Sequence, residues 1–158
     1  MIAARIIDPE GKRQAILDAA LALFAQRGFH GTPVPLIAAQ AGVAMGTVYR
    51  HFASKDVLVN ALYRHWKQTM VDTVFAQVPP GAEVREQFRA LWRGLSDFAH
   101  REPLALTFLE LHHHAPYLDA ASQQLARDLE RPAEQFIAHA QERGVVRRGE
   151  PARGAKAH

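Results

Sequence analysis

Two short helical segments that meet at Gly42 constrain the fold of this chain more than any other sequence feature. The first segment carries the apolar residues Ile37 and Ala41, and the second carries Val48 and Phe52, four positions apart on one face. Glycine lacks a Cβ and tolerates left-handed backbone angles, so Gly42 can end the first helix in a tight turn. The pattern predicts a helix-turn-helix, whose second helix enters the DNA major groove; a helical hairpin without a DNA role is the simpler alternative.

The rest of the chain is also periodic and predicts an all-α fold. Further helices are expected over residues 11–27, from Ser54 up to Pro79, and over 83–101, 104–114 and 119–143. Thr32 and Ser54 are expected to cap their helices, and the apolar stripe of residues 83–101 to face a core. Pro132 is expected to bend the last helix.

These helices divide into two regions. Residues 1–53 are expected to form a three-helix bundle with the helix-turn-helix, and residues 54–144 a second helical region. Residues 145–158 show no periodicity and are expected to be a disordered tail.

Composition narrows the chemistry and the compartment. Hydrophobic residues make up 48% of the 158 residues and charged residues 22%, as in folded proteins. The absence of cysteine excludes disulfides, thiolate metal sites and cysteine nucleophiles. A net charge of +3 permits a polyanionic partner without identifying one. No apolar run approaches the roughly 18 residues of a membrane span and no signal segment is evident, so a cytoplasmic, nucleoid-associated protein without membrane contact is expected.

A combination of residues within about 11–60 is specific to one family. Its members are Phe24-Ala25, Gly28-Phe29, Thr32, Ile37-Ala38, Ala41-Gly42-Val43, Gly46-Thr47-Val48-Tyr49, His51-Phe52, Ser54-Lys55-Asp56 and Leu58. This combination resembles the N-terminal signature of the TetR family of transcription regulators. The resemblance implies that residues 1–53 are a DNA-binding head and that residues 54–144 are a helical ligand-binding, regulatory body. It also implies a homodimer that binds double-stranded DNA, represses transcription, and releases its operator when a small-molecule effector binds the body. It implies no cofactor.

The positions expected to contact DNA follow from this resemblance and from their chemistry. They are Thr32, Met45, Gly46, Thr47, Tyr49, Arg50, His51 and Lys55. Tyr49 and His51 can reach phosphates or bases, although packing within the head is an alternative for Tyr49. Gly46 permits close approach of the backbone, and Thr32 lies where helix N-terminal amides suit a phosphate. Lys55 supplies a positive charge, whereas Arg50 faces either DNA or solvent.

Two residues at the start of the second short helix depart from the family pattern. Ala44 cannot act as a side-chain cap, which costs the helix about 1 kcal/mol. Met45 offers contact with a thymine methyl group in place of a charged donor. An unusual operator preference is therefore expected.

The effector site is expected among apolar residues of the body. The candidate residues are Trp66, Met70, Phe88, Trp92, Phe108, Leu111, His112 and Tyr117. For any one of them, filling a closed core is at least as good an interpretation.

Metal and catalytic sites are not expected. Glu110 and His113 have the spacing of a helical di-iron pair, but consecutive residues of the run His112–His114 would point about 100° apart on a helix and cannot share one ion. The serines at 54, 96 and 122 do not lie in a nucleophile elbow, and no phosphate-binding glycine loop is present. An enzyme is therefore not expected.

Members of the family usually dimerise through two further helices, and the region beyond Gly144 is expected to lack them. A homodimer would then have to use the other helices of the body. The alternative is a truncated or degenerate regulator that acts as a weak DNA-binding or protein-interaction module. The operator, the effector, and repression as opposed to activation are not specified by the sequence.

Overall fold

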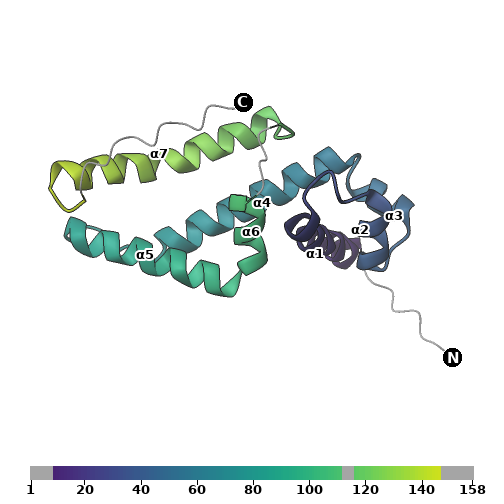
Figure 1. Ribbon diagram of the computed structural model, residues 1–158, viewed down its shortest axis with the longest axis horizontal. Coiled ribbons are helices and arrows are strands. Elements are labelled where there is room, and N and C mark those ends of the chain that lie inside the picture. Colours follow the sequence, from purple (N-terminus) through teal and green to yellow (C-terminus); the bar gives the residue numbers. More distant parts are fainter. Residues whose placement is uncertain (1–8, 112–115, 147–158) are drawn as a thin grey trace.

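The computed structural model describes residues 9–111 and 116–146, and this part of the chain contains helices and no strands (Figure 1). The helices are α1 (Pro9–Arg27), α2 (Val34–Ala41), α3 (Met45–His51), α4 (Lys55–Phe75), α5 (Val84–Arg101), α6 (Pro103–Leu111) and α7 (Ala120–Glu142). Helices α1 to α3 and the first half of α4 form the head, and the rest of α4 with α5 to α7 forms the body. The expected all-α fold with a helix-turn-helix is confirmed.

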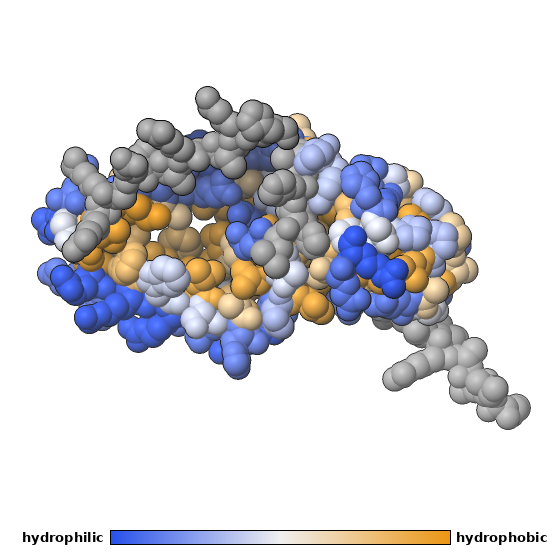
Figure 2. All heavy atoms as spheres, viewed as in Figure 1, coloured by the Kyte–Doolittle hydropathy of each residue, from blue (hydrophilic) through white to orange (hydrophobic). Residues whose placement is uncertain are grey.

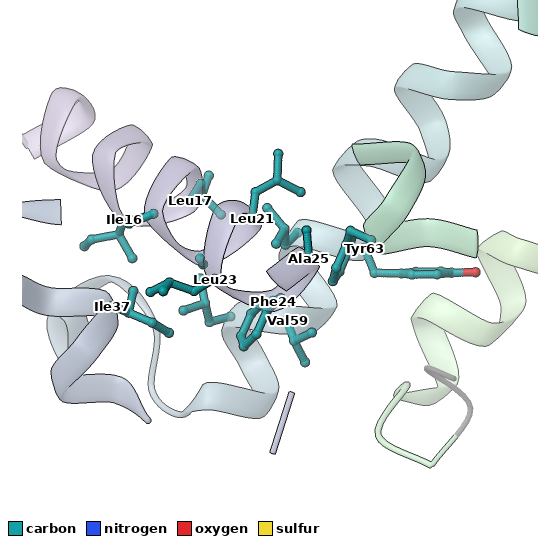
Figure 3. Close-up of a cluster of buried hydrophobic side chains, with 14 of the residues drawn as sticks. Ile16, Leu17, Leu21, Leu23, Phe24, Ala25, Ile37, Val59 and Tyr63 are labelled. Carbon is teal, nitrogen blue, oxygen red and sulfur yellow. The ribbon is translucent and has the colours of Figure 1, made fainter. Parts of the chain in front are cut away.

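The head closes around one face of α1. Ile16 and Phe24 of α1 are buried in one cluster with Ile37 of α2, Val48 of α3 and Phe52, which directly follows α3. The close-up of this cluster shows Ile37 pointing toward Ile16 on α1 (Figure 3). Each fully buried side chain of this size contributes about 1.5–3 kcal/mol, so the two short helices are stabilised mainly by packing.

The turn between α2 and α3 is built on Gly42, as the sequence predicts. Its φ of 67° and ψ of 32° lie in the left-handed region. The Gly42 amide donates to the Ala39 carbonyl at 3.2 Å, and the Val43 amide donates to the Ala38 carbonyl at 3.0 Å. This pair of hydrogen bonds is a Schellman motif, which ends α2 and redirects the chain into α3.

Helix α4 belongs to both regions. Ser54 caps it as expected, because its hydroxyl accepts a hydrogen bond from the Val57 amide at 3.2 Å. Leu58 and Leu62 are buried in the head, whereas the second half of the helix extends into the body (Figure 1). The helix ends at Phe75, earlier than the expected break at Pro79. Residues 76–78 form a turn in which the Val78 amide donates to the Phe75 carbonyl at 3.0 Å, and Val78 precedes a proline, which disfavours the helical conformation there.

The body is assembled on α4. Helices α5 and α7 both pack on it, and α6 packs against α1 of the head. Helix α5 approaches α4 closely at Gly94, where an added Cβ would lie 2.8 Å from the Val74 carbonyl oxygen. Phe108 of α6 is buried and stacks on Phe24, with ring centroids 6.2 Å apart. The body is therefore joined to the head through α4 and α6.

One cap differs from expectation, because the N-cap of α2 is Pro33 and not Thr32. Helix α7 is one element with Pro132 inside it, and the expected bend at Pro132 stays a prediction. Beyond α7 the chain turns at Gly144, which has a φ of 69°, and the Val145 amide donates to the Ala140 carbonyl at 2.9 Å. Residues 147–158 lie outside the described part.

No helix within the described ranges is long and apolar enough to cross a membrane.

Candidate nucleic-acid interface

Helix α3 presents large side chains to solvent. Met45 is 41% exposed and Tyr49 is 46% exposed, while Val48 on the opposite face is buried. Arg50 is exposed and His51 is half-buried in the last turn, which makes this end of the helix basic. A DNA groove presents base edges and phosphates. The exposed thioether of Met45, phenol of Tyr49 and guanidinium of Arg50 are groups that can contact them.

Gly46 and Thr47 lie between these side chains in the first turn of α3. A Cβ added at Gly46 would meet nothing within 4 Å, so packing of the head does not require glycine there. Thr47 is half-buried. Ala44 precedes the helix in an extended conformation and makes no side-chain cap, as its chemistry predicts. A bare backbone at Gly46 leaves room for a partner to approach α3 closely.

Thr32 faces the interior of the head. Its side chain is 0% exposed, and its hydroxyl donates to the Gly28 carbonyl at 2.8 Å and approaches the Leu23 carbonyl at 3.3 Å. It therefore satisfies carbonyls at the end of α1 and does not cap α2. Pro33 and Pro35 have no amide hydrogen, so within residues 32–36 few donors remain at the start of α2 for a phosphate.

Lys55 binds the loop between α1 and α2. Its ammonium donates to the Phe29 carbonyl at 2.8 Å and to the Thr32 carbonyl at 3.3 Å. The same nitrogen lies 4.2 Å from the centroid of the Phe29 ring, a cation–π contact. These contacts hold the loop against the start of α4.

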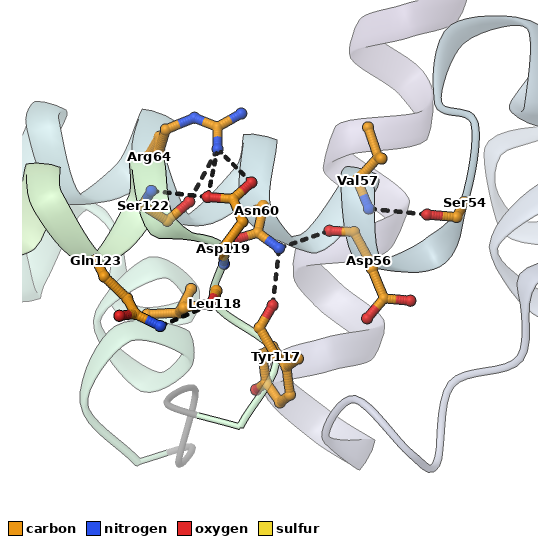
Figure 4. Close-up of polar contacts among 10 residues, drawn as sticks. All are labelled: Ser54, Asp56, Val57, Asn60, Arg64, Tyr117, Leu118, Asp119, Ser122 and Gln123. Carbon is orange, nitrogen blue, oxygen red and sulfur yellow. Dashed lines mark hydrogen bonds and ion pairs between the residues drawn. The ribbon is translucent and has the colours of Figure 1, made fainter.

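A polar cluster joins this loop to the body, and we call it the junction: Phe29, Lys55, Asn60, Tyr117 and Asp119. The Tyr117 ring stacks on Phe29 with centroids 4.3 Å apart. The buried Asn60 amide donates to the Asp56 carbonyl at 2.8 Å and to the Tyr117 carbonyl at 2.9 Å, and its oxygen accepts from the Asp119 amide at 2.9 Å (Figure 4). A buried amide with all of these bonds made fixes the relative position of the parts it links.

Asp119 anchors the start of α7 at the junction. Its carboxylate accepts from the Ser122 amide at 2.7 Å and forms an ion pair with Arg64 at 3.2 Å (Figure 4). The hydrogen bond from the Ser122 amide is the main reason that the pKa of Asp119 is lowered, and Arg64 contributes in the same direction. Burial raises the pKa of Tyr117.

An apolar groove of about 290 Å³ lies in the body among α4, α5 and α7. Apolar side chains gather in the hollow between α5 and α7 (Figure 2). Its lining consists of Lys67, Met70, Val71, Val74, Phe75, Phe88, Leu91, Trp92, Leu95, Leu129, Glu130, Ala133, Phe136 and Ile137. Trp92 is 60% exposed. The apolar stripe of α5 thus lines an open groove over much of its length, which corrects the expectation that it faces a closed core.

Three of the expected effector-site residues meet in this groove. They are Met70, Phe88 and Trp92. For two others the structure gives no placement, because His112 and the side chain of Leu111 lie outside the described part.

The remaining three expected residues lie elsewhere. Trp66 packs edge-on against Phe98, with centroids 6.4 Å apart. Phe108 stacks on Phe24 in the closed core, and Tyr117 belongs to the junction. Helical periodicity does not distinguish a side chain that faces a cavity from one that faces the core, since both lie on the apolar stripe.

Sequence reasoning missed the junction and the charged residues of the groove. Asn60 and Lys67 lie on α4 among apolar residues, and their partners Tyr117 and Glu130 are more than fifty positions away. The burial of Asn60, which requires hydrogen-bonding partners for its amide, is known only from the structure.

No group of three or more histidine, aspartate or glutamate residues that could hold a metal ion occurs within residues 9–111 and 116–146. The run His112–His114 lies outside these ranges.

Comparisons with known proteins identify both regions. Residues 16–62 match the family described as bacterial regulatory proteins, tetR family, and residues 63–153 match the tetracyclin repressor-like C-terminal domain. The chain is 35% identical over 94 residues to the HTH-type transcriptional repressor KstR of Rhodococcus jostii, a match that covers 59% of this chain and 43% of that repressor. It is 41% identical over 66 residues to the repressor KstR2 of Mycobacterium tuberculosis, covering 42% of this chain and 31% of KstR2. The matches thus span less than half the length of these relatives.

A solved structure shows the same fold. The crystal structure of a tetR family transcription regulator from Shewanella sp. PV-4 superposes with a TM-score of 0.72 at 34% identity, covering 84% of this chain and 71% of that one. The helix-turn-helix, the helical body and the matches to both family domains agree with one another. The chain therefore belongs to the TetR family of bacterial regulatory proteins.

Proposed function

We propose that this chain is a DNA-binding transcriptional repressor that holds its operator through α3 and releases it when a small apolar effector fills the groove. The observation that carries the proposal is the outer face of α3, where Met45, Tyr49 and Arg50 are exposed on a helix held by buried Val48 and Phe52. Relatives that are repressors support the same assignment. The proposed activity takes place on nucleoid DNA in the cytoplasm.

In the proposed complex α3 lies in the major groove. Tyr49 and Arg50 bind phosphates, His51 reaches a phosphate or a base, and the first turn with Met45, Gly46 and Thr47 faces base edges. The Thr32 hydroxyl and Lys55 contribute mainly indirectly, because they fix the loop before α2. A homodimer would place two α3 helices about one DNA turn apart, roughly 34–36 Å, on a palindromic operator.

The junction offers a route for effector control. Helix α7 lines one side of the groove, and Asn60 and Arg64 hold its N-cap, Asp119, against α4. Tyr117 stacks on Phe29, whose carbonyl accepts from Lys55. An effector that moves α7 would therefore shift the loop that positions α2 and α3. The effector must bind the two arrangements of α7 with different affinity for this control to operate.

The test begins with selection of bound sequences from a random DNA pool, followed by fluorescence anisotropy with the selected operator. Tyr49→Ala and Arg50→Ala are expected to weaken binding about tenfold each, since both remove a direct contact. Arg50→Ala should also lower the slope of affinity against salt by about one charge. Arg89→Ala, an exposed arginine of α5 in the body, is the matched control and should bind normally.

A palindromic consensus would support the dimer. Failure to select any DNA, or unchanged affinity in both α3 variants, would rule out α3 as the reading helix.

A further inference from the structure

One pair of charges interrupts the apolar lining of the groove. Lys67 of α4 and Glu130 of α7 form an ion pair with 3.1 Å between Nζ and Oε1. The other twelve lining residues are apolar. A charge at the wall of an apolar cavity restricts which ligands can enter, because its partner must be kept or replaced.

The two partners differ in burial. The Lys67 side chain is 12% exposed, whereas that of Glu130 is 53% exposed. If Glu130 turns into solvent it regains water and loses little, since an exposed carboxylate gains little from such a pair. The Lys67 side chain is mostly buried, so its ammonium does not regain water in this way and still needs an anion beside it. Glu130 is therefore the exchangeable member of the pair.

We propose that the groove binds a monocarboxylic acid with an apolar chain, whose carboxylate replaces Glu130 at the Nζ of Lys67. This rests on the proposed function, which makes the groove the effector site. The chain lies along Met70, Val74 and Phe88, which offer no hydrogen-bonding side chain. An alcohol of equal length would fill the same space without giving Lys67 an anion, and an alkylammonium would place two cations together.

The size of the groove favours a chain of moderate length. A volume of about 290 Å³ lies at the small end of small-molecule pockets. Each methylene that enters should tighten binding about fourfold until the groove is full, after which further methylenes should add little.

The exchange also has a mechanical consequence. Lys67 lies on α4 and Glu130 on α7, so replacing Glu130 removes an ion pair that holds these two helices together. Ligand entry then loosens α7, the helix whose first turn the junction anchors. The same carboxylate that gives affinity would supply the signal.

The experiment is calorimetric titration of the full chain with octanoate, octan-1-ol and octyltrimethylammonium. Octanoate is expected to bind about tenfold more tightly than the alcohol, and the cation least well. Lys67→Gln should abolish the preference for octanoate over octanol, and Glu130→Gln should tighten octanoate several-fold by removing the competing carboxylate. Arg131→Gln and Glu134→Gln are the matched controls, because these exposed residues lie on α7 beside Glu130 but outside the groove lining. Both variants should leave all three affinities unchanged.

Equal binding of octanoate and octanol, tightest binding of the cation, or a preference that survives Lys67→Gln would overturn the proposal. If circular dichroism shows that Lys67→Gln does not fold, Glu130→Gln decides, and unchanged octanoate affinity there is a negative result. Operator binding separates the two proposals. If octanoate binds by way of Lys67 without releasing DNA, the ligand class is supported and effector control is refuted. If octanol binds as tightly as octanoate and releases DNA, effector control is supported and the ligand class is refuted.

Discussion

The head and the body bury their apolar residues in different ways. In the head, α1, α2, α3 and the start of α4 close around Phe24 and Ile16, and their apolar stripes face one another. In the body, α5 and α7 pack on α4 but leave an apolar groove open among them, with Trp92 largely in solvent. The α5 stripe is at least as regular as that of α1, so regular amphipathicity alone does not determine whether a helix closes a core.

The difference fits the two tasks of the proposed function. A reading head must hold its recognition helix in one position, which a closed core achieves. A sensing body must admit a ligand and change its packing, which requires apolar surface that is only partly covered. The open surface costs stability, and the body keeps its shape through a few specific contacts, such as those of Gly94 and Asn60.

The difference between the closed core and the open groove is tested most directly by replacing one phenylalanine with alanine in each region. Phe24→Ala should lower the free energy of unfolding by about 3–5 kcal/mol, because it opens a cavity in a closed core. Phe88→Ala, at the wall of the groove, should cost about 1 kcal/mol, because solvent already reaches the space. Urea denaturation measures both. Equal losses would mean that the groove is closed in solution.

A second test compares two glycines. Gly94→Ala should destabilise the chain by about 1–3 kcal/mol, since the new Cβ would meet the Val74 backbone at 2.8 Å and force α4 and α5 apart. Gly46→Ala should add up to about 1 kcal/mol of stability, since nothing lies within 4 Å and alanine favours helix. Operator binding should weaken in Gly46→Ala and persist in Gly94→Ala at temperatures where it is folded. The opposite pattern would exchange the roles assigned to the two regions.

The junction provides the third test, because it joins the two regions. Asn60→Ala should cost about 1–3 kcal/mol by leaving the Tyr117 carbonyl and the Asp119 amide without their partner. The release of DNA by effector should weaken as well. Gln68→Ala, which removes an exposed hydrogen bond to Asp72 on α4, is the control and should change stability by less than about 0.5 kcal/mol. Effector control that persists undiminished in Asn60→Ala would show that coupling bypasses the junction.

The smallest predicted effect is a change in stability at acidic pH. The pKa of Asp119 is lowered from 3.8, chiefly by the Ser122 amide, so its carboxylate favours the folded state above that pH. Protonation in the folded chain removes this contribution as the pH falls below about 3.8 toward the lowered pKa. The urea midpoint of the natural chain should therefore fall more steeply between pH 5 and 3 than that of Asp119→Asn. Parallel curves would show that Asp119 contributes nothing to the stability of the junction.

Most of the helices could be predicted from the sequence, since their periodicity and end signals are local. Gly42 and Ser54 act as predicted because a positive φ and a hydroxyl cap depend on adjacent residues. Thr32 did not cap α2, because its hydroxyl turns toward the Gly28 and Leu23 carbonyls, four and nine residues back, and does not accept from an amide of α2. A local signal is reliable only when tertiary contacts offer the side chain nothing better.

The candidate sites were harder to predict. Exposure of Tyr49 on α3 agrees with the predicted reading face, whereas Lys55 is engaged with the Phe29 and Thr32 carbonyls, a role that required knowing where the loop lies. Only part of the expected effector set meets in the groove. Which apolar stripe closes and which stays open depends on how α5 and α7 approach α4, and this is a property of the assembled helices.

The start of the recognition helix has one more consequence. Ala44 supplies no side-chain acceptor to the first amides of α3, whereas Ser54 supplies one to α4 a few residues later. The opening turn of α3 should therefore exchange its amide hydrogens with heavy water sooner than the opening turn of α4, although both flank the same closed core. In the proposed complex with DNA, an opening turn that frays while Val48 holds the middle of α3 can adjust its first residues to different operators. Breadth of recognition in this chain would then come from one missing hydroxyl.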